Sequence, residues 1–71
     1  MLSKTLAMNN AFSPLLPLIV TAREAVRDDK VAEICVEDMW RKLSVLVKRE
    51  GRFIVIKGYR NGYLDSIDYC I

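Results

Sequence analysis

The sequence contains no histidine, and this absence removes several kinds of chemistry at once. Without an imidazole, the chain lacks the commonest general base, the Ser–His and Cys–His nucleophilic pairs, and the usual nitrogen ligand of a zinc site. The acidic pairs Asp28-Asp29 and Glu37-Asp38 have simpler explanations, as a chain break and as the start of a helix. We therefore predict that the protein is not an enzyme and that it has no catalytic residues, no metal site and no cofactor.

Cysteine, glycine and long apolar runs are also scarce. The two cysteines, Cys35 and Cys70, allow one disulfide at most, and the sequence favours two reduced, largely buried thiols. The three glycines are too scattered for a phosphate-binding loop. No apolar run approaches the roughly 18 residues of a membrane span. A faint signal-peptidase pattern at residues 20–22 follows a run that Pro14 and Pro17 interrupt, so we expect a cytoplasmic protein.

Hydrophobic residues make up 52% of the 71 residues, which predicts one small folded domain over residues 1–71. Residues 1–12 are expected to form a loose N-terminal arm. A core of this size is thin, and self-association would bury more apolar surface.

The dipeptide Asn61-Gly62 is the clearest local signal, because Asn-Gly favours the positive φ angles of a type I′ hairpin turn. The flanking segments, residues 52–57 and 63–71, are rich in β-branched and aromatic residues. A two-residue loop pairs Arg60 with Tyr63 and predicts one face made of Ile54, Ile56, Ile67, Tyr69 and Ile71. A longer loop that includes Gly58 would change this register.

Residues 37–50, just before the hairpin, have a pattern that predicts a helix. Acidic residues lie at its start and basic residues at its end, as the helix dipole favours, and Gly51 follows as a stop signal. Apolar residues recur at helical spacing, with Trp40 widening a stripe that consists of Met39, Leu43, Leu46 and Val47. We interpret this stripe as core rather than as a ligand site.

A first helix is predicted to start either with Ser13 as its cap and Pro14 at its first position, or at Pro17. The polar residues 28–30 end it, and its expected buried stripe is Leu18, Ala22, Ala25 and Val26. The start of this helix offers more apolar surface than one stripe can bury. We therefore predict a homodimer whose interface contains Leu15, Leu16, Leu18, Ile19 and Val20.

Residues 30–36 fit either a short strand or a helical turn joined to the second helix. Ala32, Glu33 and the acidic residues that follow favour the helix. The expected fold class is α+β, with two to three N-terminal helices followed by a C-terminal antiparallel β-hairpin.

Charge is distributed unevenly along the chain. Residues 23–40 carry a net charge of −3, from three cations and six anions, whereas residues 41–62 carry +6, from seven cations and Glu50 alone. A segment this basic predicts a positive patch on the folded surface.

The predicted helix ends in Leu46-Val47-Lys48-Arg49-Glu50-Gly51-Arg52 and is followed by a hairpin with a basic, aromatic tip. In outline, residues 37–70 resemble a winged-helix domain. The resemblance implies that the helix enters the major groove of DNA and that the hairpin wing touches the backbone. The residues expected to bind nucleic acid, mostly through phosphate, are Arg41, Lys42, Lys48, Arg49, Arg52, Lys57 and Arg60.

An alternative hypothesis is a small regulator that binds a protein, as many small chains of phages and other mobile elements do by covering a host protein's surface. The thin core, the apolar first helix and the opposite charges of successive segments favour it. A last strand ending in residues 69–71 would also be able to add to a partner's sheet. Salt-dependent binding to arbitrary DNA separates the two hypotheses, because only the first requires it.

Overall fold

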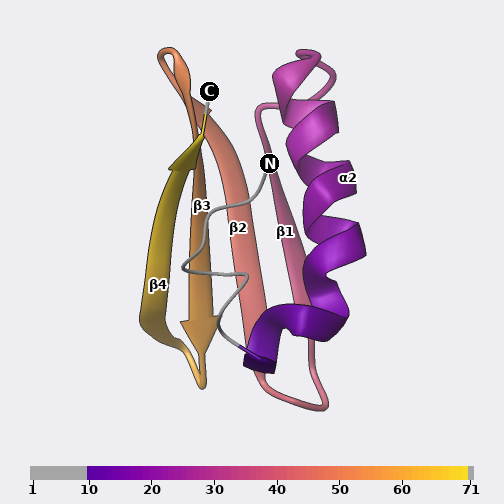
Figure 1. The fold of residues 1–71 in the computed structure, drawn as a ribbon, viewed down its shortest axis with the longest axis vertical. Helices are drawn as coiled ribbons and strands as arrows, with labels where there is room; N and C mark the ends of the chain where they lie inside the picture. The colour runs from indigo at the N-terminus through magenta and orange to yellow at the C-terminus, as the bar shows by residue number, and fades with distance from the viewer. Residues whose placement is uncertain (1–9, 71) are drawn as a thin grey trace.

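The computed structural model describes residues 10–70, which form one α-helix packed against a four-stranded antiparallel sheet. A 3₁₀-helix, η1 (Asn10–Leu15), leads into α2 (Leu16–Arg27), and the strands follow as β1 (Glu33–Asp38), β2 (Leu43–Glu50), β3 (Phe53–Arg60) and β4 (Tyr63–Cys70). Each strand pairs with the next, so the sheet is a meander with β1 and β4 at its edges (Figure 1). The predicted α+β class is confirmed. The described residues contain one α-helix, however, rather than two or three, and a four-stranded sheet rather than a lone hairpin.

α2 starts and ends where local chemistry favours it. Pro17 lies in its first turn, where the missing N–H leaves no intrahelical hydrogen bond unmade. At the other end, Lys30 N–H donates to Ala25 O (3.1 Å) and Asp29 N–H donates to Val26 O (3.3 Å). These two bonds form a Schellman closure, which requires the left-handed conformation that Asp29 adopts (φ 58°). The predicted polar break is therefore the end of the helix.

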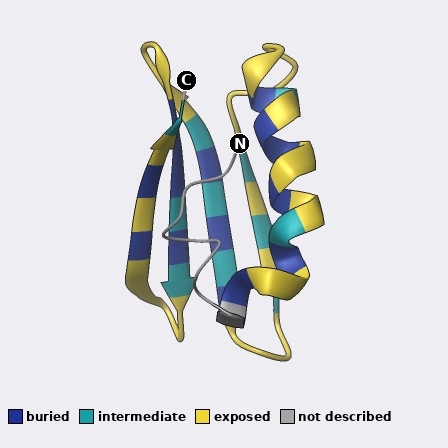
Figure 2. Ribbon diagram, in the orientation of Figure 1, coloured by how far each residue is buried: buried dark blue, intermediate teal, exposed yellow. Residues whose placement is uncertain are grey.

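The buried side of α2 differs from the predicted stripe at its first position. Ile19, Ala22 and Val26 are buried against the sheet, Arg23 is buried beside them, and Leu18 is exposed. Figure 2 shows the buried and exposed residues of α2 as separate bands along the helix. The helix is thus rotated so that Ile19, rather than Leu18, shares a face with Ala22 and Val26 at i, i+3 and i+7.

The helix predicted over residues 37–50 is wrong, and so is the helical interpretation of residues 30–36. These residues form β1, a turn, and β2. In β2 the period is two, because Leu43, Val45 and Val47 are buried and alternate with half-buried residues. Met39, which was expected in the core, lies in the exposed turn. Gly51 does not stop a helix; it takes φ 61° at the first position of the two-residue β2–β3 turn, where a type II′ turn needs a positive φ.

The Asn61-Gly62 turn is confirmed, but the predicted register holds only beside it. Both residues have positive φ (53° and 82°), as a type I′ turn requires, and Arg60 pairs with Tyr63. A β-bulge next to Gly58 then adds one residue to β4, because Gly58 pairs with Ser66 while Tyr59 pairs with Leu64.

This one-residue shift corrects the predicted face. Ile56 pairs with Asp68 rather than Ile67, so Ser66, Asp68 and Cys70 face α2. Ile67 and Tyr69 point to the opposite face instead of joining the core. Ile71 lies outside the described residues.

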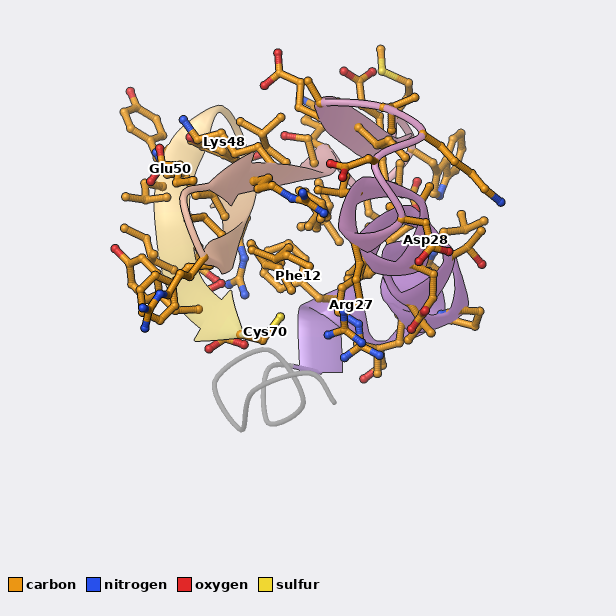
Figure 3. All side chains as sticks on the ribbon, turned by 90° about the horizontal axis from the view of Figure 1, so that it is seen from above. Phe12, Arg27, Asp28, Lys48, Glu50 and Cys70 are labelled. Carbon is orange, nitrogen blue, oxygen red and sulfur yellow. The ribbon has the colours of Figure 1, made fainter. Side chains whose placement is uncertain are left out.

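The core lies between α2 and the sheet, with Phe12 of η1 at its centre (Figure 3). Fully buried side chains come from every layer: Phe12, Ile19, Val26, Val45, Val47 and Ile56. α2 packs mainly over β1 and β2, and β4 lies at the far edge (Figure 1). Residues 1–9 of the predicted N-terminal arm lie outside the described residues, whereas Phe12 is fully buried.

Candidate interaction surfaces

The seven cations predicted to bind nucleic acid are dispersed over the molecule. Arg41 and Lys42 lie in the β1–β2 turn, and Arg60 ends β3 at the same end of the sheet. Arg52 lies in the β2–β3 turn at the opposite end. Lys48 and Lys57 project from the outer face of the sheet, the face turned away from α2, whereas Arg49 projects from the inner face. In a meander, residues that are close in the sequence lie at different ends or on different faces of the sheet, because the chain reverses at each turn and side chains alternate between faces along each strand.

Arg49 ties the end of α2 to the sheet. Its Nη2 donates to Val26 O (2.9 Å) and to Arg27 O, and its Nη1 pairs with the Asp29 carboxylate at 2.5 Å. The guanidinium gives Arg27 O a hydrogen bond and adds a second one to Val26 O, which also accepts from Asp29 N–H. Its charge complements the negative end of the helix dipole. Arg49 therefore has a structural role in this fold.

Three further cations of this set have a carboxylate nearby. Lys48 Nζ lies 2.9 Å from Glu50 Oε1, and Figure 3 shows both side chains on the side of the sheet away from Phe12. The hydrogen bond and charge of Glu50 raise the pKa of Lys48, and those of Lys48 lower the pKa of Glu50. Arg41 pairs with Asp38 at 2.7 Å, and Arg60 pairs with Asp65 at 3.4 Å. Together with Arg49, four of the seven cations therefore lie beside a carboxylate.

The recognition helix of the winged-helix outline does not exist in this fold. Residues 37–50, which were predicted to enter a DNA groove as a helix, form the end of β1, a turn and the strand β2. β2 is paired on both sides, by β1 and β3. The winged-helix outline is therefore wrong, although the nucleic-acid hypothesis itself stays a prediction.

The predicted dimer residues separate into core and surface. Leu15 and Ile19 are buried in the core of a single chain, and Leu16 packs partly against it. Leu18 and Val20 are exposed, at 53% and 40%. Leu18 and Val20 are therefore the members of the set that offer substantial surface to another molecule.

The outer face of the sheet carries an apolar surface that the sequence did not predict as a site. We call it the outer-face patch: Phe53, Tyr59, Leu64, Ile67 and Tyr69. Cross-strand pairing places Tyr59 beside Leu64, Lys57 beside Ile67, and Val55 beside Tyr69. Four of its members are between 39% and 61% exposed, namely Phe53, Leu64, Ile67 and Tyr69. The sequence signal that would have revealed it is Gly58, since a glycine inside a strand marks a bulge and so a change of face.

The end of the sheet that carries the β1–β2 and β3–β4 turns exposes further apolar side chains. Trp40 is 93% exposed, and Met39 and Tyr63 are also exposed. Asn61 N–H donates to Lys42 O (2.9 Å) and joins the two turns, between which lies a cleft of about 600 Å³. Lys42 adopts the left-handed conformation (φ 56°) in the first of these turns.

The two cysteines are free thiols at opposite edges of the sheet. Three strand spacings separate β1 from β4, about 14 Å, which is too far for a disulfide within one chain. Cys35 is exposed rather than buried. Its pKa is nonetheless raised, first by the partial loss of water around the thiol and then by the nearby charge and hydrogen bond of Glu37.

Within residues 10–70, three carboxylate or thiol side chains nowhere come together as a metal site would need. No helix in the same range is both long and apolar enough to cross a bilayer.

Comparisons with known protein families, with curated protein sequences and with solved structures gave no match to this chain.

Proposed function

We propose that this chain is a non-enzymatic binding protein that docks onto another protein through the outer-face patch. The observation that carries this proposal is the exposure of Phe53, Leu64, Ile67 and Tyr69 together on the face opposite α2. An antiparallel sheet that faces water on one side normally presents polar residues there. Contiguous apolar and aromatic surface on such a face is typical of a protein contact site.

Charge also favours a protein partner for this face. The Lys48 ammonium is held by Glu50, and Glu33 and Glu37 lie on the same face along β1. A phosphate backbone would gain little there, because its binding depends on cations that are free to replace counterions. An apolar centre rimmed by charges of both signs is the arrangement that protein interfaces use.

Site-specific crosslinking tests this proposal. A photoreactive phenylalanine derivative replaces Tyr69 in the patch or, as a matched control, exposed Val20 on α2. Crosslinking in cells should yield a defined protein adduct from position 69 and little from position 20. Leu64→Glu and Ile67→Glu should each abolish that adduct with unchanged circular dichroism, because both side chains are exposed. An adduct that survives both charged substitutions, or a nucleic-acid adduct in its place, would overturn the proposal.

Nucleic acid is a second candidate partner, favoured by one observation. Lys48 and Lys57 project from the same face as Phe53, Tyr59 and Tyr69, and aromatic side chains beside cations on a sheet can stack single-stranded bases. The test is a mobility-shift titration with single-stranded DNA at two salt concentrations. Binding through this face should weaken when Lys48 and Lys57 are both replaced by alanine, and its dependence on salt should decrease. Arg52→Ala, at the end of the sheet, is the control.

A further inference from the structure

A groove runs between α2 and β1, on the other side of the molecule from the outer-face patch. Its lining from α2 is apolar or small, with Leu18, Ala22 and Ala25 beside Thr21. β1 contributes residues 34–37. The groove has a volume of about 400 Å³, and Leu18 at its rim is exposed. Figure 1 shows α2 running alongside β1.

The strand that borders this groove has an open edge. No other strand within residues 10–70 pairs with β1 on the side away from β2. Arg49 N–H donates to Ala32 O, so residues 32 and 49 are opposite each other as a hydrogen-bonded pair. Hydrogen-bonded pairs alternate along an antiparallel ladder, so residues 34 and 36 bond to β2. The N–H and C=O groups of Glu33, Cys35 and Glu37 therefore point to the open edge.

We propose that β1 accepts an extended peptide segment of a partner as a fifth strand of the sheet. Residues that face each other across paired strands share a face. Partner side chains opposite Ile34 and Val36 would therefore enter the groove beside Leu18 and should be apolar. Partner side chains on the outer face would lie next to Glu33 and Glu37 and should be lysine or arginine. The ligand is thus an extended segment in which apolar and basic residues alternate.

The same charges disfavour a second copy of this chain at this edge. Antiparallel pairing of β1 with another β1 about Cys35 places Glu33 opposite Glu37, and like charges directly opposite are destabilising. The other edge strand, β4, brings Asp65 and Asp68 rather than cations. A basic segment of another protein has the complementary charge. This site does not depend on the outer-face patch, so either proposal stands if the other fails.

The test uses a fluorescein-labelled heptapeptide of alternating lysine and valine, followed by fluorescence anisotropy at low and moderate salt. We expect saturable binding that weakens with salt, and at least tenfold weaker binding when glutamate replaces the lysines. Hydrogen exchange followed by NMR should show slowed amides at Glu33, Cys35 and Glu37, with little change in β4. Slowed exchange in β4 instead, or equal binding of the glutamate peptide, would overturn the proposal.

Two protein variants examine the geometry. Cys35→Pro removes an N–H that points to the open edge and leaves the ladder to β2 intact, so the chain should fold and lose binding at least tenfold. The double variant Glu33→Lys with Glu37→Lys changes exposed side chains only, and its reversed charge should also weaken peptide binding at least tenfold. It replaces the proline variant as the test if that variant does not fold. Leu64→Glu in the outer-face patch is the control and should bind the peptide as the unmodified chain does. Unchanged binding by the charge-reversed chain would refute the inference. A dimer in sedimentation that Leu18→Glu converts to monomer would also refute it, because a second copy would then occupy the groove.

Discussion

Arg23 carries a charged side chain in a buried position on α2. Its side chain is 8% exposed, and its Nη2 reaches Glu24 at 3.2 Å. Its Nε and Nη1 are buried without a hydrogen-bond partner among residues 10–70. A buried cation that is only partly hydrogen-bonded costs free energy of folding, and an apolar side chain of similar volume often relieves that cost.

We therefore expect Arg23→Met to leave the free energy of unfolding unchanged or to raise it by about 1–2 kcal/mol. Arg23→Ala should lower it by about 2 kcal/mol, because the truncated side chain leaves a void in the core. Urea unfolding followed by circular dichroism measures both, since Trp40 is too exposed for its fluorescence to report reliably on the core. A strongly destabilised Arg23→Met chain would show that the guanidinium itself stabilises the fold.

The carboxyl of Asp38 should titrate below its ordinary value of 3.8. The main cause is the hydrogen bond that the Arg41 backbone N–H donates to it (3.1 Å), and the Arg41 side chain adds a smaller effect. A lowered pKa in the folded state means that the ionised carboxylate stabilises the turn at pH values above its ordinary pKa of 3.8. That stabilisation disappears as the pH falls through the lower folded value.

An NMR titration of the Asp38 carboxyl carbon tests this cause. In Arg41→Ala the backbone N–H remains, so the pKa of Asp38 should rise only part of the way towards 3.8. A full return to 3.8 would mean that the guanidinium, rather than the backbone, holds the carboxylate.

The positions of the cations in residues 41–60 depend on the fold and not on their spacing in the sequence. Residues 41–60 contain seven cations, but their number does not say which face or end of the fold each one occupies. Lys48 and Arg49 are neighbours in β2, yet one projects from the outer face and the other anchors α2 on the inner face. Side-chain alternation along a strand separates such neighbours, whereas a helix would have kept them within one turn.

Among the elements, the β3–β4 turn needs glycine at position 62 because of its backbone conformation and not because space is limited there. Gly62 has φ 82°, and a Cβ there would meet no atom within 4 Å. Gly62→Ala should therefore lower the free energy of unfolding by about 1 kcal/mol through conformational strain rather than collision. D-alanine at the same position, introduced by chemical synthesis, favours positive φ and should be neutral or stabilising. Thermal unfolding compares the stability of the unmodified chain, Gly62→Ala and the D-alanine variant. Equal losses of stability in the two alanine variants would point to a steric cause.

The junction of α2 with β2 depends on the forked geometry of Arg49. Arg49→Lys keeps the charge but cannot satisfy two carbonyls and a carboxylate together. We expect a loss of about 1–2 kcal/mol in the free energy of unfolding and faster amide exchange at residues 28–32. Arg52→Lys, in the exposed β2–β3 turn, is the matched control and should change neither. Exchange that stays slow in Arg49→Lys would contradict this role.

The sequence predicted well those features that depend on a few neighbouring residues. Asn61-Gly62 specified its turn, and the polar run after Arg27 specified the end of α2. Residues 37–50 were misassigned because Leu43, Leu46 and Val47 fit a period of 3.6, while Leu43, Val45 and Val47 fit a period of two equally well. What decides between them is pairing with β1 and β3, a long-range interaction that no local pattern contains.

At the scale of the molecule, one helix covers one face of the sheet, and within residues 10–70 no second helix covers the other face. α2 lies over β1 and β2, and the core closes around Phe12. The apolar excess that suggested a dimer through the first helix is largely buried within one chain, because Leu15 and Ile19 are core residues. The exposed pair Leu18 and Val20 is too small for a stable dimer, which usually buries at least about 1,200 Å² in total. The outer-face patch offers the larger apolar area.

We therefore expect any self-association of the isolated 8.1 kDa chain to use the outer-face patch rather than α2. Sedimentation velocity at tens of micromolar, roughly where weak contacts form, should show a concentration-dependent species that Leu64→Glu with Ile67→Glu converts to monomer. Leu18→Glu with Val20→Glu should leave that species unchanged. Ile19→Glu is uninformative here, because a charge at a fully buried position unfolds the chain whatever its partners. If instead the two substitutions in α2 convert the species to monomer and the two in the outer-face patch do not, the helix-mediated dimer expected from the sequence is correct. The groove beside β1 is then an interface between copies of this chain.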